Sequence, residues 1–121
     1  QMALVAATLT NDGYQPAPKL ANSYQDENGN WIAFGQSTTQ QQVLDSAVAF
    51  RIRERLKAEK QAIWYQVGHA NIADDEPLTW YIGGTTPEWT GTPLAIAIAI
   101  EGSQPALALQ IGSALLNPAA P

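Results

Sequence analysis

Residues 94–100 alternate strictly between large and small side chains. Leu94, Ile96, Ile98 and Ile100 occupy every second position, and alanine fills the positions between them. Successive side chains of a β-strand point to opposite faces, so this segment has one bulky, branched face and one flat face. We predict a central strand with a helix packed closely on its alanine side.

Two further pairs of segments have the composition of antiparallel strands. Residues 20–25 and 31–36 flank an Asn-Gly turn, which is a strong hairpin signal. Residues 62–70 and 78–83 are rich in aromatic and branched side chains, and the acidic loop 71–77 joins them. We predict that these two are neighbouring antiparallel strands of one sheet.

Apolar residues recur at helical spacing near both ends of the chain. Residues 1–12 have this spacing, and Gly13 follows where a left-handed helix cap would lie. Near the other end, Ser103 is placed to cap a second amphipathic helix. The large residues that form its apolar face, four positions apart, are Leu107, Ile111 and Leu115.

The longest predicted helix runs from about Thr38 to Lys60. Ser37, followed three residues later by Gln40, resembles a capping box at its start. Five of the six cations of the chain lie in this helix: Arg51, Arg53, Arg55, Lys57 and Lys60. They could form a docking surface for acidic partners, but glutamates are interleaved with them and cations favour helix C-termini. We interpret them as an ordinary solvated face.

The order of these elements is helix, two strands, helix, three strands and helix. The predicted class is therefore α+β, with an antiparallel sheet covered by helices. The 121 residues, 45% apolar and 14% charged, suffice for one globular unit. Because Gln1 precedes Met2 inside a predicted helix, we expect the chain to be a fragment of a larger protein.

Charge and composition exclude several kinds of partner. The net charge of -5 and the pI near 4.5 argue against binding to nucleic acid or to anionic lipid. The longest apolar run, residues 93–100, is far shorter than the roughly 20 residues that cross a bilayer. Cysteine is absent, which excludes disulfides and thiolate metal sites.

The chain carries no complete catalytic constellation. No serine is followed three positions later by lysine, as a nucleophile of the Ser-x-x-Lys kind would be. His69 is the single histidine, and no Gly-x-Ser-x-Gly elbow accompanies it, so neither a serine triad nor a histidine zinc site is supported. The consecutive Asp74, Asp75 and Glu76 are interpreted as a solvated turn. We expect no catalytic residue, no metal and no cofactor in this chain.

Four segments occur in an order that a known family shares: residues 1–14, 79–84, 94–101 and 106–116. The second reads Thr-Trp-Tyr-Ile-Gly-Gly and is similar to the Trp-Phe-Ile-Gly strand of penicillin-binding protein transpeptidase domains. The first resembles the helix before their final strands, and the last two resemble the next strand and the closing helix. The resemblance implies that residues 1–121 are the C-terminal segment of one transpeptidase-like domain, of the penicillin-binding-protein/β-lactamase-like fold.

The implied activity is that of a serine D,D-transpeptidase, which cross-links peptidoglycan stem peptides and is acylated by β-lactams. In that family the nucleophile, its lysine and a Ser-x-Asn element come earlier, and here they would lie before Gln1. Only the third element, the Lys-Thr-Gly strand, can fall within this chain. Residues 65–70 match its Gly-Lys-Thr-Gly-Thr-Ala pattern at two of six positions.

This third motif implies four substrate-binding residues. Gln66 stands for the lysine and can hydrogen-bond but carries no charge, and Val67 stands for the threonine without its hydroxyl. Gly68 keeps the family residue, which indicates either a closely approaching substrate backbone or a bulge. His69, in place of the second threonine, could donate to a carboxylate when protonated, or be an ordinary strand histidine.

The resemblance also implies a location and partners. We expect an extracytoplasmic, membrane-anchored parent, in the periplasm or on the outer face of the bacterial membrane. Its partners would be the rest of the transpeptidase domain and a stem peptide or β-lactam, with no nucleic acid and no membrane contact by this segment. An uncovered apolar face also predicts a homodimer. A noncatalytic scaffold of cell-wall assembly and an unrelated α+β binding module remain alternatives.

Overall fold

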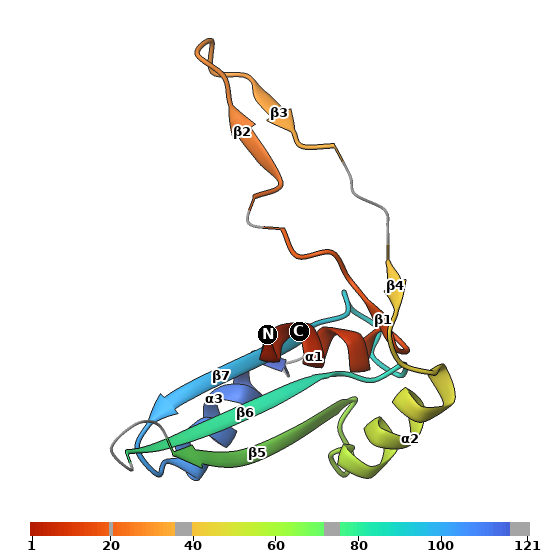
Figure 1. Cartoon of the computed structure of the whole chain (residues 1–121), viewed down its shortest axis with the longest axis vertical. Coiled ribbons are helices and arrows are strands. Elements are labelled where there is room, and N and C mark those ends of the chain that lie inside the picture. Colours follow the sequence, from red (N-terminus) through yellow and green to blue (C-terminus); the bar gives the residue numbers. More distant parts are fainter. Residues whose placement is uncertain (20, 36–39, 72–75, 117–121) are drawn as a thin grey trace.

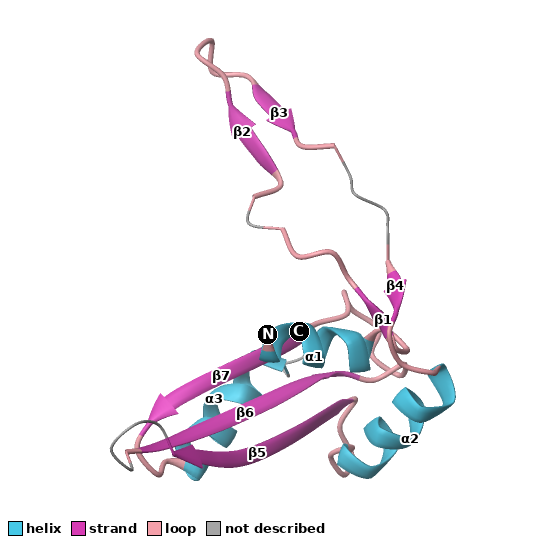
Figure 2. Ribbon diagram, in the orientation of Figure 1, coloured by secondary structure: helices cyan, strands magenta, loops and turns pink. Residues whose placement is uncertain are grey.

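The computed structural model describes residues 1–19, 21–35, 40–71 and 76–116. A body of one sheet and three helices carries a long projecting arm (Figure 1), and Figure 2 shows the same view by secondary structure. The helices are α1 (Met2–Thr10), α2 (Ser46–Leu56) and α3 (Pro105–Leu116). The strands are β1 (Tyr14–Gln15), β2 (Ser23–Gln25), β3 (Trp31–Ala33), β4 (Gln41–Gln42), β5 (Ile63–Asn71), β6 (Pro77–Thr85) and β7 (Ala95–Glu101). The predicted α+β class is confirmed.

The main sheet has the antiparallel order β5-β6-β7. The predicted pairing of the strands around 62–70 and 78–83 is confirmed. The central position predicted for β7 is wrong within the described residues, because β7 pairs there with β6 alone and β6 is the middle strand. The alanine side of β7 does face a helix, since Ala95 packs against the buried Ala6 and Leu9 of α1.

The opposite face of the sheet lies on α3, where Ile63 and Tyr81 form a buried core with Ala108 and Leu116 of the helix. The helix begins at Pro105, so Ser103 does not directly precede it as predicted. The apolar stripe predicted for this helix faces solvent. Its residues Leu107, Ile111 and Leu115 are 40%, 37% and 54% exposed.

The face of α3 that packs on the sheet is decided by the volume available between helix and sheet. The buried positions of α3 are Ala108, Gly112 and Leu116, one residue further along than the predicted stripe. At Gly112 an added Cβ would lie 2.3 Å from the ring of Tyr81. The sheet already presents bulky Ile96, Ile98 and Ile100 on this side, so the helix fits against it with its smaller residues.

The helix α2 is shorter than predicted at both ends, because it begins at Ser46 and ends at Leu56, which leaves Lys57 and Lys60 outside it. The Asp45 carboxylate caps it and accepts hydrogen bonds from the backbone N–H groups of Ala47 at 2.9 Å and Val48 at 3.3 Å. The segment Gln41–Gln42, which was predicted to be helical, forms β4 and pairs with β1. The predicted capping box is therefore wrong, although Ser37 itself lies outside the described residues.

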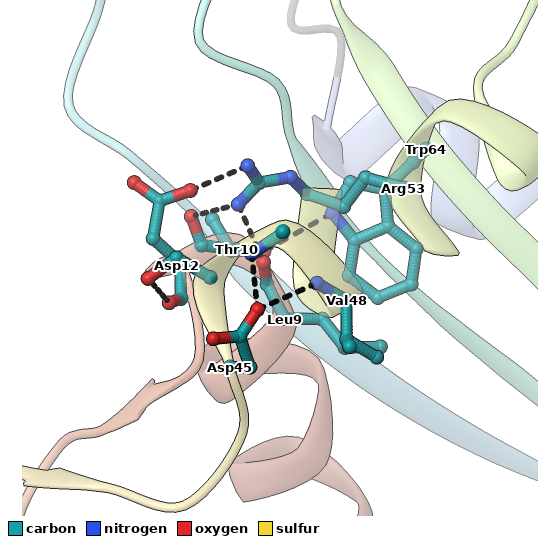
Figure 3. A network of polar contacts seen from close by, with 9 residues as sticks. Leu9, Thr10, Asp12, Asp45, Val48, Arg53 and Trp64 are labelled. Atoms are coloured by element: carbon teal, nitrogen blue, oxygen red, sulfur yellow. Dashed lines mark hydrogen bonds and ion pairs between the residues drawn. The ribbon is translucent and has the colours of Figure 1, made fainter. Parts of the chain in front are cut away.

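One of the cations of α2 is buried, contrary to the predicted solvated face. The side chain of Arg53 is 3% exposed, and its Nη1 donates to the carbonyl oxygens of Leu9 at 2.6 Å and Thr10 at 3.1 Å. Its Nη2 pairs with Asp12, as Figure 3 shows. The last carbonyls of a helix have no partner within it, so Arg53 caps α1 and holds α2 against it.

The arm rises from the paired β1 and β4 and ends in the β2–β3 hairpin, which confirms the predicted Asn-Gly hairpin. At its tip Gly29 has a positive φ of 83°, as the turn requires. The interpretation of Asp74 and Asp75 as a solvated turn falls outside the described residues. Within the described ranges, no helix is long and apolar enough to cross a membrane.

Candidate functional site

The candidate site is the free edge of the sheet along β5. At the start of this edge, the backbone N–H of Ala58 donates to the carbonyl of Ile63 at 2.9 Å, so the backbone carbonyl of Ile63 points away from β6. In an antiparallel ladder the outward direction recurs at every second residue, which gives Tyr65, Val67 and His69 outward backbone groups. An isolated bridge between Lys57 and Trp64 covers the start of this edge. Beyond it, no strand in the described part of the chain pairs with the outward groups of Val67 and His69. An extended peptide could therefore add to β5 here.

The side chains of the four predicted residues divide between the two faces of the sheet. Val67 packs at the rim of the core under α3, so the odd-numbered residues face that helix. Trp64 packs against α1, so Gln66 and Gly68 face the α1 side. The structure thus brings Gln66 and Gly68 together on one face and Val67 and His69 on the other.

Gln66 is exposed, and its Nε2 donates to the backbone carbonyl of Val67 at 2.8 Å. This carbonyl is one of the outward groups of the free edge. A ligand that pairs with β5 therefore shares this carbonyl with the Gln66 amide or displaces it. Gln66 supplies a neutral donor and acceptor, whereas the lysine of the family motif supplies a positive charge.

Gly68 is not needed by the packing of this chain. Pairing between β5 and β6 runs without interruption from Ile63 opposite Thr85 to Asn71 opposite Pro77, so the alternative of a bulge is wrong. An added Cβ at Gly68 would meet no atom within 4 Å. The missing side chain leaves open space on the α1 face beside Gln66.

His69 is exposed and lies near a buried threonine that sequence reasoning missed. Its Nδ1 is 3.5 Å from Oγ1 of Thr79, the residue opposite it on β6. The Thr79 hydroxyl donates to the Gly102 carbonyl at 2.7 Å and accepts from the Gln104 N–H at 2.8 Å. Because the Thr79 hydroxyl already donates its proton, His69 can form a hydrogen bond with the Thr79 oxygen only as a donor. A period-two pattern marks Thr79 as a strand residue but does not reveal this link to the start of α3.

The described residues hold no group of three or more potential metal ligands. An apolar groove of about 490 Å³ lies on the outer side of α1. Among its lining residues are Leu4, Val5, Val43 and Leu44, and Val5 and Val43 are each nearly half exposed. This groove has the character of a surface on which another layer of structure packs.

No protein-family model and no curated protein matches the chain. Solved structures of a penicillin-binding protein share its arrangement of helices and sheet, so the chain has a transpeptidase-like α+β fold and matches part of that protein. One of them is penicillin-binding protein A from Mycobacterium tuberculosis as an imipenem acyl-enzyme complex, with a TM-score of 0.76 and 25% identity. A second structure of the same protein has a TM-score of 0.74 and 23% identity. The matches cover 95% of this chain but only 29% and 32% of those chains.

Proposed function

We propose that the chain is the C-terminal segment of a penicillin-binding-protein-type transpeptidase domain that acts in peptidoglycan cross-linking. The observation that carries this proposal is the likeness over 95% of the chain to a protein that forms an acyl-enzyme with imipenem. The apolar groove along α1 supports it, because the rest of such a domain would cover this surface. The parent protein would then act outside the cytoplasm and be anchored in the membrane.

In this proposal the free edge of β5 binds the stem peptide or β-lactam. The ligand adds to the edge as an extended strand and pairs with the outward backbone groups of Val67 and His69. Its side that faces α1 lies over Gly68, where there is open space, and beside Gln66. The nucleophile and its lysine would come from the part of the domain that precedes residue 1.

A noncatalytic scaffold is the second candidate function, and the residue at position 66 favours it. A transpeptidase site uses a cation to stabilise developing negative charge, and Gln66 offers none. Val67 lies on the α3 face, so even a hydroxyl at this position would point away from Gln66. Under this alternative the edge of β5 would bind no stem peptide.

The chain by itself is expected to form no covalent adduct with a β-lactam, because it contains no Ser-x-x-Lys. Intact-mass spectrometry after incubation with penicillin should show the unmodified chain alone. A mass increase equal to that of the antibiotic would show that a nucleophile of this chain reacts, and would contradict the proposed division of the site.

Noncovalent binding to the β5 edge can be tested with the Gly68→Ala variant. We expect an acyl-D-alanyl-D-alanine peptide to shift the NMR signals of the Val67 and His69 amides. The added methyl should weaken this binding about tenfold, because it fills the open space over the strand. It should not destabilise the fold, since alanine is favoured over glycine in a strand by about 0.5–1 kcal/mol.

The controls separate the two candidate functions. If the peptide shifts no β5 amide in the unmodified chain, the scaffold replaces the transpeptidase proposal. If it binds equally well to Gly68→Ala, the ligand does not cross this glycine and the proposed binding mode is wrong. Thermal unfolding of the variant verifies that weaker binding is not loss of fold.

A further inference from the structure

The hairpin at the end of the arm exposes a cluster of large apolar side chains on one face. Tyr24 and Ile32 are cross-strand partners, and the ring of Phe34 packs at a tilt of 40° on that of Tyr24, with ring centroids 5.3 Å apart. We call these three residues the arm face, and they are 46%, 40% and 48% exposed respectively. The hairpin stands away from the body (Figure 1). An isolated two-stranded hairpin is marginally stable in water, so this face is suited to a partner.

The hairpin at the end of the arm is also acidic, and the one cation of the arm, Lys19, lies nearer its base. Between Leu20 and Phe50 the sequence has no lysine or arginine, and Asp26 and Glu27 lie at the tip of the hairpin. Hydrogen bonds from Asn30, first from its backbone N–H and then from its side chain, hold the pKa of Asp26 below its ordinary value. Asp26 therefore keeps its negative charge into more acidic solution than an ordinary aspartate does. A surface complementary to the arm face and the acidic tip would be apolar and positively charged.

The chain presents such a surface on α2. Val48, Arg51 and Arg55 are spaced i, i+3 and i+7, so they form one exposed stripe, which we call the α2 stripe. Of the other cations in this region, Arg53 is buried, Lys60 lies beyond the end of α2, and Lys57 binds Glu88 at 2.7 Å. That hydrogen bond lowers the pKa of Glu88 to about 2. The ion pairs seen among the described residues include neither Arg51 nor Arg55.

Within one molecule the two surfaces cannot meet, because the arm points away from α2 (Figure 1). We propose that the chain forms a homodimer in which the arm face of each copy packs on the α2 stripe of the other. Ile32 and its aromatic neighbours would cover Val48, and Glu27 would lie beside Arg51 and Arg55. The exchange is reciprocal, so the dimer closes with twofold symmetry. This contact does not rest on the proposed transpeptidase function, since neither surface includes the free edge of β5.

The cationic stripe therefore has a role beyond that of an ordinary solvated helix face. The acidic arm and the basic helix steer two copies together and fix their orientation, while the arm face supplies the apolar contact. Each charged contact occurs twice in the dimer, so a substitution at one of these residues changes the free energy of dimerisation twice over.

Charge reversal on each side tests the pairing. Sedimentation analysis of the unmodified chain from roughly 1 to 500 µM should show a monomer–dimer equilibrium that weakens with salt. Glu27→Lys should raise the dimer dissociation constant about 2- to 30-fold, and Arg51→Glu with Arg55→Glu should do the same. An equimolar mixture of the two variants should restore association as a heterodimer. Glu101→Lys, an equal charge change on the exposed end of β7, should have little effect.

Apolar substitutions supply an independent measurement. Ile32→Ser should abolish the dimer, whereas Trp31→Ser, on the other face of the same hairpin, should leave it intact and so controls for the fold of the arm. Leu115→Ser removes an exposed leucine of α3 and should also leave it intact. A chain that stays monomeric at every concentration would overturn the proposal. So would a dimer that responds to Leu115→Ser but not to Ile32→Ser, or mixed charge variants that do not associate.

Discussion

Replacing Arg53 with methionine should lower the free energy of unfolding by about 2–4 kcal/mol, because it leaves buried carbonyl groups without a donor. The guanidinium bonds the carbonyls of Leu9 and Thr10 at the end of α1 and is almost completely buried. Methionine fills similar volume but donates nothing. The change is measured by urea unfolding followed by circular dichroism, at a constant m-value.

Three matched variants identify the cause of this loss. Arg55→Met removes the same side chain from an exposed position of α2 and should change stability by less than about 0.5 kcal/mol. Asp12→Asn removes only the ion pair with Arg53, and because Asp12 is 62% exposed the cost should stay below about 1 kcal/mol. Arg53→Lys keeps the positive charge but loses the planar guanidinium with its several N–H donors. Its free energy of unfolding should lie between those of the unmodified chain and Arg53→Met. Equal stability of the Arg53→Met and Arg55→Met variants would disprove the capping role.

Replacing Gly112 with alanine should destabilise the chain by about 1–3 kcal/mol, as overpacking of a filled core does. The sign is opposite to the expectation for an ordinary helical glycine, where alanine stabilises by about 1 kcal/mol. The added methyl would lie 2.3 Å from the ring of Tyr81, which is fully buried between the sheet and α3. A backbone-borne methyl cannot turn away, so α3 or the ring must move.

A double-mutant cycle with Tyr81→Leu tests this contact. If the ring is the obstacle, Gly112→Ala should cost less in the Tyr81→Leu background, with a coupling of about 0.5–3 kcal/mol. Gly68→Ala serves as the control, since its methyl meets open space. A stabilising effect of Gly112→Ala in the unmodified chain would mean that α3 does not pack on the sheet at this distance.

The strands of the sheet were predictable because their signals are local. The alternation of isoleucine and alanine in β7 fixes which side chains share a face, and the structure places Ala95 of the alanine face in the cluster that α1 forms on the sheet, as expected. The Asn-Gly turn likewise fixes the β2–β3 hairpin through the backbone conformation of its glycine. Such features depend on neighbours along the chain, and no distant contact is needed to produce them.

The helices show where local signals failed. In α3 the largest residues, Leu107, Ile111 and Leu115, suggested the apolar face, yet the buried face holds Ala108 and Gly112. Which face is buried depends on the volume that the sheet leaves free, and the sequence of the helix does not contain that volume. In α2 a cation pattern typical of a solvated face contained one arginine that is buried by the end of another helix.

For the candidate site, the sequence by itself determined the strand, its neighbour β6 and the identity of the residues on it, because side-chain periodicity and turn chemistry are properties of short segments. Only the tertiary structure decided that β5 lies at an edge, that Gln66 and Gly68 share one face, and that Val67 and His69 share the other with the buried Thr79. The physical reason is that an edge is defined by the absence of a hydrogen-bonded neighbour, and a face by what packs against it. Both depend on contacts between residues far apart in the chain.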